Sequence, residues 1–225
     1  MGLDLIAVSD HNSTGNLKAF GEALDRFGQG EISGLYGTEV QTREEVHLLC
    51  LFDELNRATA FGKFVQENLP AVENREEIFG SQPLVDAEDK IVGKEDRLLL
   101  NSLAVGLEEV AERVERGKGL PIPAHVCRPA FGLLEQLGFF PRQFPALELG
   151  PETVKEGRER LKGKFPSVLG EALVGFSDAH RPEQIGRVFT ELQLEKGTIS
   201  ELRRAFRKER GRRILGIKSS EGTVF

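Results

Sequence analysis

Residues 3–12 read LDLIAVSDHN, a short apolar run that stops abruptly at Asp10 and His11. The length of this run and its content of Leu, Ile and Val are typical of a strand buried on both faces, as in a parallel sheet. In α/β folds, functional side chains lie at the carboxyl ends of such strands. The stretch therefore predicts a strand with two candidate metal ligands at its end, followed by a helix over residues 15–27.

Further strand-like runs follow along the chain and alternate with segments of helical spacing. Strands are expected at 31–40, 46–52, 120–126, 146–149 and 172–177, with a hairpin over 82–92 and helices over 57–69, 107–116 and 199–208. This alternation favours a parallel α/β fold, and a barrel more than an open sheet. One domain is expected over residues 1–215, with an elaborated connection at 53–119 and a loosely structured tail at 216–225.

Composition excludes several classes of protein. The chain has 30 Lys and Arg against 36 Asp and Glu, so its formal net charge is −6, which argues against non-specific binding to nucleic acid or anionic lipid. No apolar run approaches the ~18 residues that span a bilayer, so no membrane association is expected. Cys50 and Cys127 are the only cysteines, and no disulfide framework is expected. These features predict a cytoplasmic globular protein.

Each histidine of the chain lies within or just after a strand-like run, and acidic residues occur at matching places. The candidates are His11, His47, His125 and His180, with Asp10, Glu39 and Asp178. Imidazole and carboxylate ligands suit divalent ions of the Zn, Mn or Fe type. A carboxylate such as Glu39 could bridge two ions, and ions ~3.5–4 Å apart activate a water for attack on phosphorus. The pattern therefore predicts metal-dependent phosphoester hydrolysis.

Other interpretations of these residues stay open at this point. A lone His on an apolar strand is more often a core residue than a ligand, although finding every His at a strand end argues against coincidence. Cys127 follows His125 by two residues and shares its face of a strand, which permits a Cys–His nucleophile pair. A metal-dependent amidohydrolase on a similar barrel is a further alternative, which ranks lowest because no lysine lies at a strand end.

Four segments stand out for their order and spacing along the chain. They are GLDLIAVSDHNS at 2–13, GTEVQTREEVHLLCLF at 37–52, PAHVCRPAFGLLEQLGFFP at 123–141 and GFSDAH at 175–180. Together they resemble the motifs of the PHP (polymerase and histidinol phosphatase) family of metal-dependent phosphoesterases. The resemblance implies a distorted (β/α)7 TIM-like barrel with up to three divalent ions (Zn, Mn or Fe) at the carboxyl ends of its strands.

The resemblance also implies a role for each candidate side chain. The implied metal ligands are His11 and His180 for one ion, His47 and His125 for a second, Asp178 for a third, and Glu39 as a bridge. Asp10 and His180 are implied as catalytic groups that assist proton transfer, with Asp10 alternatively a ligand or an orienting group. Arg128 falls where a guanidinium could hold the substrate phosphate.

One feature of the family is absent from this sequence. PHP members open with a strand that carries His-x-His, and no such tripeptide occurs here. The first βα unit is therefore expected to be missing from this chain, through a misplaced start or true loss. With that segment present, we expect a phosphoesterase acting on a small phosphorylated substrate, such as a nucleotide or short oligonucleotide, and not on duplex nucleic acid. The alternative is an impaired remnant that serves as a metal-binding or regulatory module.

Overall fold

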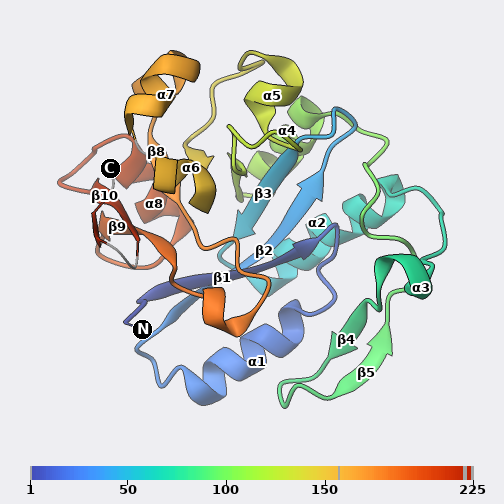
Figure 1. The fold of residues 1–225 in the computed structure, drawn as a ribbon. Helices are drawn as coiled ribbons and strands as arrows, with labels where there is room; N and C mark the ends of the chain where they lie inside the picture. Colours follow the sequence, from blue (N-terminus) through green and yellow to red (C-terminus); the bar gives the residue numbers. More distant parts are fainter. Residues whose placement is uncertain (1, 157, 220–221, 224–225) are drawn as a thin grey trace. The chain divides into compact units, whose positions relative to one another are not determined.

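The opening stretch forms strand β1 (Leu5–His11), which is followed by helix α1 (Leu17–Phe27) and pairs in parallel with β2 (Ser33–Gln41) (Figure 1). Strand β2 then turns back and pairs antiparallel with β3 (His47–Phe52). All six residues of β3 are buried, as its unbroken apolar sequence predicts. The strand order of this sheet is β1-β2-β3-β6, so β1 lies at its edge.

This computed structural model describes residues 2–156, 158–219 and 222–223, and the chain divides into two compact units. One unit spans Asp4–Pro121, and the other comprises Met1–Leu3 and Ile122–Phe225. Each unit is described by itself below.

In the Asp4–Pro121 unit, the β1–β3 strands are followed by the segment that was expected to be an elaborated connection. Its elements are α2 (Leu55–Asn68), α3 (Glu76–Phe79), β4 (Pro83–Val85), β5 (Ile91–Lys94), α4 (Leu107–Arg116) and the start of β6 (Leu120–Pro123). Strands β4 and β5 pair antiparallel, which confirms the predicted hairpin. Helix α4 has the predicted bounds and buries one face through Leu107, Val110, Ala111 and Val114, the spacing of an amphipathic helix.

The second unit has shorter strands and more turns. Its elements are α5 (Leu133–Leu137), β7 (Leu147–Leu149), α6 (Pro151–Glu156), α7 (Arg158–Lys164), η1 (Pro166–Gly170), β8 (Leu173–Gly175), η2 (Pro182–Gln184), β9 (Val188–Gln193), α8 (Ile199–Phe206), β10 (Arg213–Ser219) and β11 (Gly222–Thr223). Strands β7 and β8 pair in parallel, whereas β10 pairs antiparallel with β9 and β11. Helix α8 is capped by the Thr198 hydroxyl, which accepts a hydrogen bond from the Glu201 N–H.

The structure confirms a mixed α/β fold and corrects several expectations. Among the described residues, the strands form separate sheets and no closed barrel is detected, so the seven-stranded barrel stays a prediction. Strand β1 is partly exposed rather than buried on both faces, because it is an edge strand that pairs, among the described strands, with β2 alone. The expected strand over 120–126 ends at Pro123, so His125 lies beyond it.

Three further expectations concern the extent of the domain, the tail and the membrane. Residues 216–219 of the expected loose tail belong to β10, while 220, 221, 224 and 225 lie outside the described residues. A single domain over 1–215 stays a prediction. None of the helices in the described residues combines the length and the hydrophobicity of a membrane-spanning segment.

Candidate metal centre and neighbouring sites

Three of the predicted ligands come together in the Asp4–Pro121 unit because they lie on adjacent strands. His11 ends β1 and is paired in register with Glu39 of β2. His47 begins β3 and is paired with Gln41, two residues beyond Glu39 on the same face of β2. The strand register therefore brings two imidazoles to one carboxylate.

The geometry of this cluster fits a divalent ion. The Nδ1 atoms of His11 and His47 lie 3.3 Å and 3.1 Å from the same Glu39 oxygen, Oε2, and one ligand atom from each residue lies within 4.8 Å of the others. Metal–ligand bonds of about 2.0–2.2 Å at near-tetrahedral or octahedral angles separate neighbouring ligand atoms by about 3 Å. The donor set, two imidazoles with one carboxylate, is one that Zn, Mn or Fe accepts.

Asn12, which was not predicted as a site residue, ties the end of β1 to its surroundings. Its backbone N–H donates to the Glu39 carbonyl at 2.9 Å, and its side-chain oxygen accepts from the Gln41 N–H at 3.1 Å. Its amide nitrogen donates to the carbonyls of Leu99 and Asn101 at 2.8 and 2.9 Å. Asn12 is buried with φ of 47°, a left-handed conformation that Asn tolerates better than most residues. Asn12 thus holds the end of β1, where His11 lies, against the backbone of β2 beside Glu39.

Asp10, predicted as a catalytic group, lies outside this cluster. Successive side chains of a strand point to opposite faces, so Asp10 and His11 diverge. The Asp10 carboxylate accepts a hydrogen bond from the Asn16 side chain at 2.9 Å, and its carbonyl accepts from the Thr38 hydroxyl. A catalytic role for Asp10 stays a prediction.

The other four predicted site residues lie in the second unit. Three of them, His125, Arg128 and Asp178, lie in the wall of a cavity of about 320 Å³. The Arg128 guanidinium lies 3.7 Å from the Asp178 carboxylate. Lys164 and Arg187 line the same cavity and were not predicted. The cavity therefore combines three cationic side chains and an imidazole with three carboxylates, those of Asp178, Glu152 and Glu156.

The backbone at this cavity is strained at two predicted site residues. His125 has φ of 32° and Asp178 has φ of 45°, conformations that are rare for residues with a side chain and that concentrate at functional sites. The His125 N–H donates to the buried Glu148 carboxylate at 3.1 Å, which holds this turn. His180 is exposed, with Nδ1 3.8 Å from the Asp178 carboxylate.

The structure argues against Cys127 as a nucleophile. Burial raises the pKa of the Cys127 thiol to about 12, with Lys164 lowering it in part. A thiol reacts as its thiolate, and at neutral pH this one is held protonated. Cys50 is also buried, and burial raises the pKa of its thiol.

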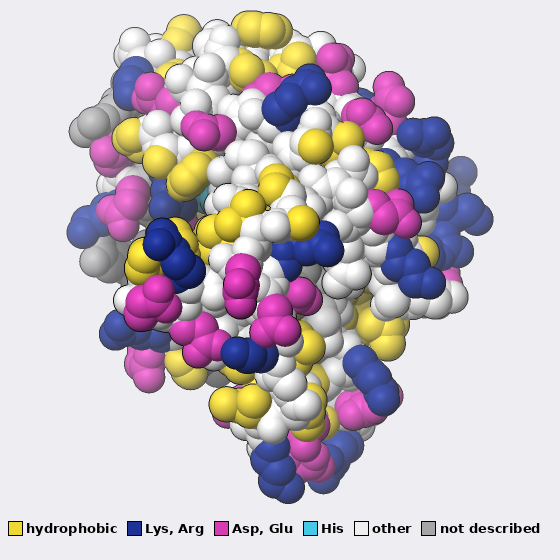
Figure 2. All heavy atoms as spheres, turned by 90° about the vertical axis from the view of Figure 1, so that its right-hand side faces the viewer, with side chains coloured by type: hydrophobic (Ala, Val, Ile, Leu, Met, Phe, Trp, Pro, Cys, Tyr) yellow, Lys and Arg dark blue, Asp and Glu magenta, His cyan; other side chains and the backbone are white. Residues whose placement is uncertain are grey.

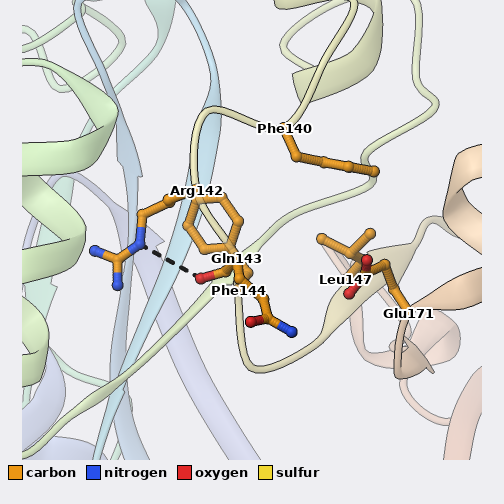
Figure 3. Close-up of a pocket in the computed structure, with 6 residues that line it drawn as sticks. All are labelled: Phe140, Arg142, Gln143, Phe144, Leu147 and Glu171. Carbon is orange, nitrogen blue, oxygen red and sulfur yellow. Dashed lines mark hydrogen bonds between the residues drawn. The ribbon is translucent and has the colours of Figure 1, made fainter.

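A second hollow, of about 290 Å³, contains none of the predicted site residues. Phe140, Arg142, Gln143, Phe144, Leu147 and Glu171 line it (Figure 3). The Arg142 guanidinium lies over the Phe144 ring at 5.6 Å. On the face drawn in Figure 2, cationic and anionic side chains are interspersed with small groups of hydrophobic ones.

Comparisons with known proteins give one family-model match and several solved structures with a similar fold. Residues 165–210 match a family model described as PHP-associated. Two solved structures of endonuclease Q, a PHP-family enzyme, each align with 97% of this chain at 19% identity. One is the lesion-specific endonuclease of Pyrococcus furiosus (TM-score 0.62), and the other is a complex with a 27-mer duplex substrate that has an abasic lesion at the active site (TM-score 0.65).

The alignment covers only 51% of each endonuclease Q chain, so the present chain spans about half their length. PsfC of Pseudomonas syringae PB-5123 is also similar, with a TM-score of 0.52 at 15% identity over 95% of this chain and 77% of that one. The comparison with curated proteins gives no match.

The duplex substrate in the endonuclease Q complex overturns the expectation that duplex nucleic acid is not a partner. That expectation came from the small phosphorylated substrate expected for this chain and from its net charge of −6. Net charge describes a whole chain, whereas recognition of phosphate depends on local charge. Here Arg128, Lys164 and Arg187 line one cavity together with three carboxylates, so cationic groups are available at one place although the chain as a whole is negative.

Proposed function

Because the resemblance to the PHP family is confirmed by the PHP-associated segment and by the fold, we propose that this chain is a metal-dependent phosphoesterase that cleaves nucleic-acid phosphodiesters. The observation that carries the proposal is the approach of two imidazole Nδ1 atoms to one Glu39 oxygen, at 3.3 and 3.1 Å. A structural His–Glu pair needs one imidazole, whereas two imidazoles at one carboxylate oxygen supply the nitrogen and oxygen donors that zinc sites use.

In this proposal His11, Glu39 and His47 hold a divalent ion of the Zn, Mn or Fe type. A bound ion of this kind lowers the pKa of a coordinated water and neutralises charge on phosphate oxygens. Glu39 supplies the negative charge of the ligand set, and the two histidines bind through uncharged nitrogens. His125, Asp178 and His180 are proposed as further ligands on the strength of the family resemblance. The seven-stranded barrel of the family is proposed on the same ground.

The cavity of the second unit offers hydrogen-bond donors that suit a phosphate group, beside the carboxylates of Asp178, Glu152 and Glu156. The Arg128 guanidinium can donate two parallel hydrogen bonds to phosphate oxygens, and Lys164, which forms an ion pair with Glu135, lies in the same wall. Arg187 donates to the backbone carbonyls of Ser177 and Asp178 at 2.7 and 3.3 Å, so it fixes this turn and adds positive charge. We propose that these groups bind a backbone phosphate of the substrate, with His180 and Asp10 as the groups that move protons.

The test combines metal binding with hydrolysis. The chain is stripped with chelator, and its binding of Mn²⁺, Zn²⁺ and Fe²⁺ is measured by calorimetry under anaerobic conditions where Fe²⁺ is used. Hydrolysis is then followed on end-labelled single strands, intact duplexes and duplexes with one abasic site, and on chromogenic phosphate esters. Glu39→Gln removes the shared carboxylate charge, and Glu45→Gln, an exposed carboxylate of the β2–β3 turn, is the matched control.

We expect wild type and Glu45→Gln to bind metal and to cleave at least one phosphoester substrate, and Glu39→Gln to do neither. Equal metal binding by Glu39→Gln and wild type would refute the assigned centre. Metal binding without cleavage of any substrate would refute the enzymatic part and leave the metal-binding module.

A further inference from the structure

The two ring nitrogens of His47 face two different acceptors. Its Nδ1 lies 3.1 Å from Glu39 Oε2, and its Nε2 lies 3.4 Å from Gln41 Oε1. His47 and Gln41 are both buried, with 4% and 8% exposed surface. Gln41 was not predicted as a site residue, although its spacing of two from Glu39 places both side chains on one face of β2.

The hydrogen bonds of Gln41 set which of its side-chain atoms faces His47. The Gln41 amide nitrogen donates to the Ser102 hydroxyl at 2.8 Å. Its backbone N–H donates to Asn12, and its carbonyl accepts from the Leu103 N–H. With the backbone held on both sides and the amide nitrogen engaged by Ser102, the side-chain oxygen points at the His47 ring. A carbonyl oxygen only accepts, so it favours a proton on His47 Nε2.

This arrangement determines what the other nitrogen can do. A neutral imidazole carries one N–H, so a proton on Nε2 leaves a lone pair on Nδ1. That lone pair faces a carboxylate oxygen at 3.1 Å, which is unfavourable unless a proton or a metal ion lies between the two atoms. Imidazoles that bind metals commonly donate their other N–H to an oxygen, which fixes ring orientation and tautomer.

We propose that Gln41 is a positioning residue of the metal centre: its side-chain oxygen holds the proton on His47 Nε2 and so presents Nδ1 to a divalent cation shared with Glu39 and His11. Ser102 supports this role by orienting the Gln41 amide. The inference rests on the proposed metal centre. It adds Gln41 as the residue that selects which ring nitrogen of His47 binds the metal ion.

Three variants and one control test the proposal. Gln41→Met keeps the length of the side chain and removes the acceptor, Gln41→Glu keeps an acceptor, and Ser102→Ala removes only the partner of the amide. Gln82→Met is the control, because the Gln82 side chain makes three hydrogen bonds elsewhere in the same unit, to the backbone of Glu95, Arg97 and Leu99. Gln82→Met therefore lowers stability without touching the centre.

Zn²⁺ affinity is measured by calorimetry on the full chain, and the tautomer of His47 by ¹⁵N NMR of the Zn²⁺-loaded protein, with His47→Asn assigning the signal. We expect a proton on Nε2 of His47 in wild type, a loss of about 10–100-fold in affinity for Gln41→Met, recovery in Gln41→Glu, and a smaller loss in Ser102→Ala. Gln82→Met should keep wild-type affinity despite a lower melting temperature.

Two results would overturn the proposal while leaving the metal centre intact: wild-type affinity in Gln41→Met, or a proton on Nδ1 of His47 in the loaded protein. If Gln41→Met does not fold, the comparison uses the other two variants. In that case the proposal is overturned if Gln41→Glu binds Zn²⁺ no more tightly than Ser102→Ala does. Failure of wild type to bind any ion would overturn both this proposal and the proposed function.

Discussion

Substituting Gly132 with alanine should destabilise the turn that carries His125 and Arg128. An alanine Cβ at this position would lie 2.3 Å from the Arg128 carbonyl oxygen, 2.7 Å from the Arg128 nitrogen and 3.0 Å from the His125 carbonyl oxygen. All three atoms belong to the backbone, so no side-chain rotation relieves the contact. The φ of −78° and ψ of 131° at Gly132 suit any residue, so the cost is steric alone.

The magnitude follows from the closeness of these contacts. Overpacking costs about 1–3 kcal/mol, and backbone contacts this short place Gly132→Ala near the upper figure. For a chain of this size each kcal/mol lowers the melting temperature by about 2–4 °C, so a fall of about 6–12 °C is expected.

The assay is thermal unfolding followed by circular dichroism, with urea unfolding as a second measure. Gly163→Ala is the matched control, because an added Cβ at Gly163 meets no atom within 4 Å, and it should leave stability unchanged or slightly higher. A melting temperature of Gly132→Ala equal to that of wild type would show that the turn does not have this conformation.

Three further predictions test other parts of the structure. Asn12→Ala removes two donated hydrogen bonds and one accepted hydrogen bond of a buried side chain. It should lower the free energy of unfolding, measured in urea, by about 3 kcal/mol; a decrease below about 1 kcal/mol would contradict these three hydrogen bonds. Hydrogen bonds from Arg212, and then from the Glu195 N–H, lower the pKa of the buried Glu201 carboxylate from 4.5 to about 2, so its stabilising effect is complete above pH 4.5 and is lost as the pH falls to about 2. The stability difference between wild type and Glu201→Gln should therefore narrow over that pH range, and a constant difference would refute the assignment. Because burial raises the pKa of Cys127 to about 12, iodoacetamide should label it slowly at pH 8 in the folded protein and quickly in urea, whereas equal rates would show an accessible thiolate.

Much of the first unit was predictable because its signals are local. The β3 segment is apolar at nearly every position, and α4 has an amphipathic pattern closed by Gly117, so both were predicted from short windows. The partial exposure of β1 could not be predicted from its own residues, since the burial of a strand depends on which strands lie beside it. Strands β9 and β10 mix polar and apolar residues and depend on pairing with each other, which no short window reveals.

The same distinction applies to the candidate site. His11, Glu39 and His47 stand out in the sequence as metal-ligand types, and the strand register brings them together. His47 lies at the start of β3, not at its carboxyl end, and reaches the same edge because β3 runs antiparallel to β2. The role of the three residues as ligands stays a prediction. Gln41 and Asn12 are ordinary amides in the sequence, and their importance arises only from what they contact. Lys164 and Arg187 come from segments without a motif, so only the folded chain places them at one cavity.

The most direct test of the metal centre is anomalous X-ray scattering from crystals of the chain grown with saturating Mn²⁺ or Zn²⁺, recorded on both sides of the absorption edge of the metal. We predict an anomalous peak within bonding distance of His11 Nδ1, Glu39 Oε2 and His47 Nδ1 together. The account would be contradicted if anomalous peaks occurred only at other places and these three side chains were hydrogen-bonded to one another with no ion among them.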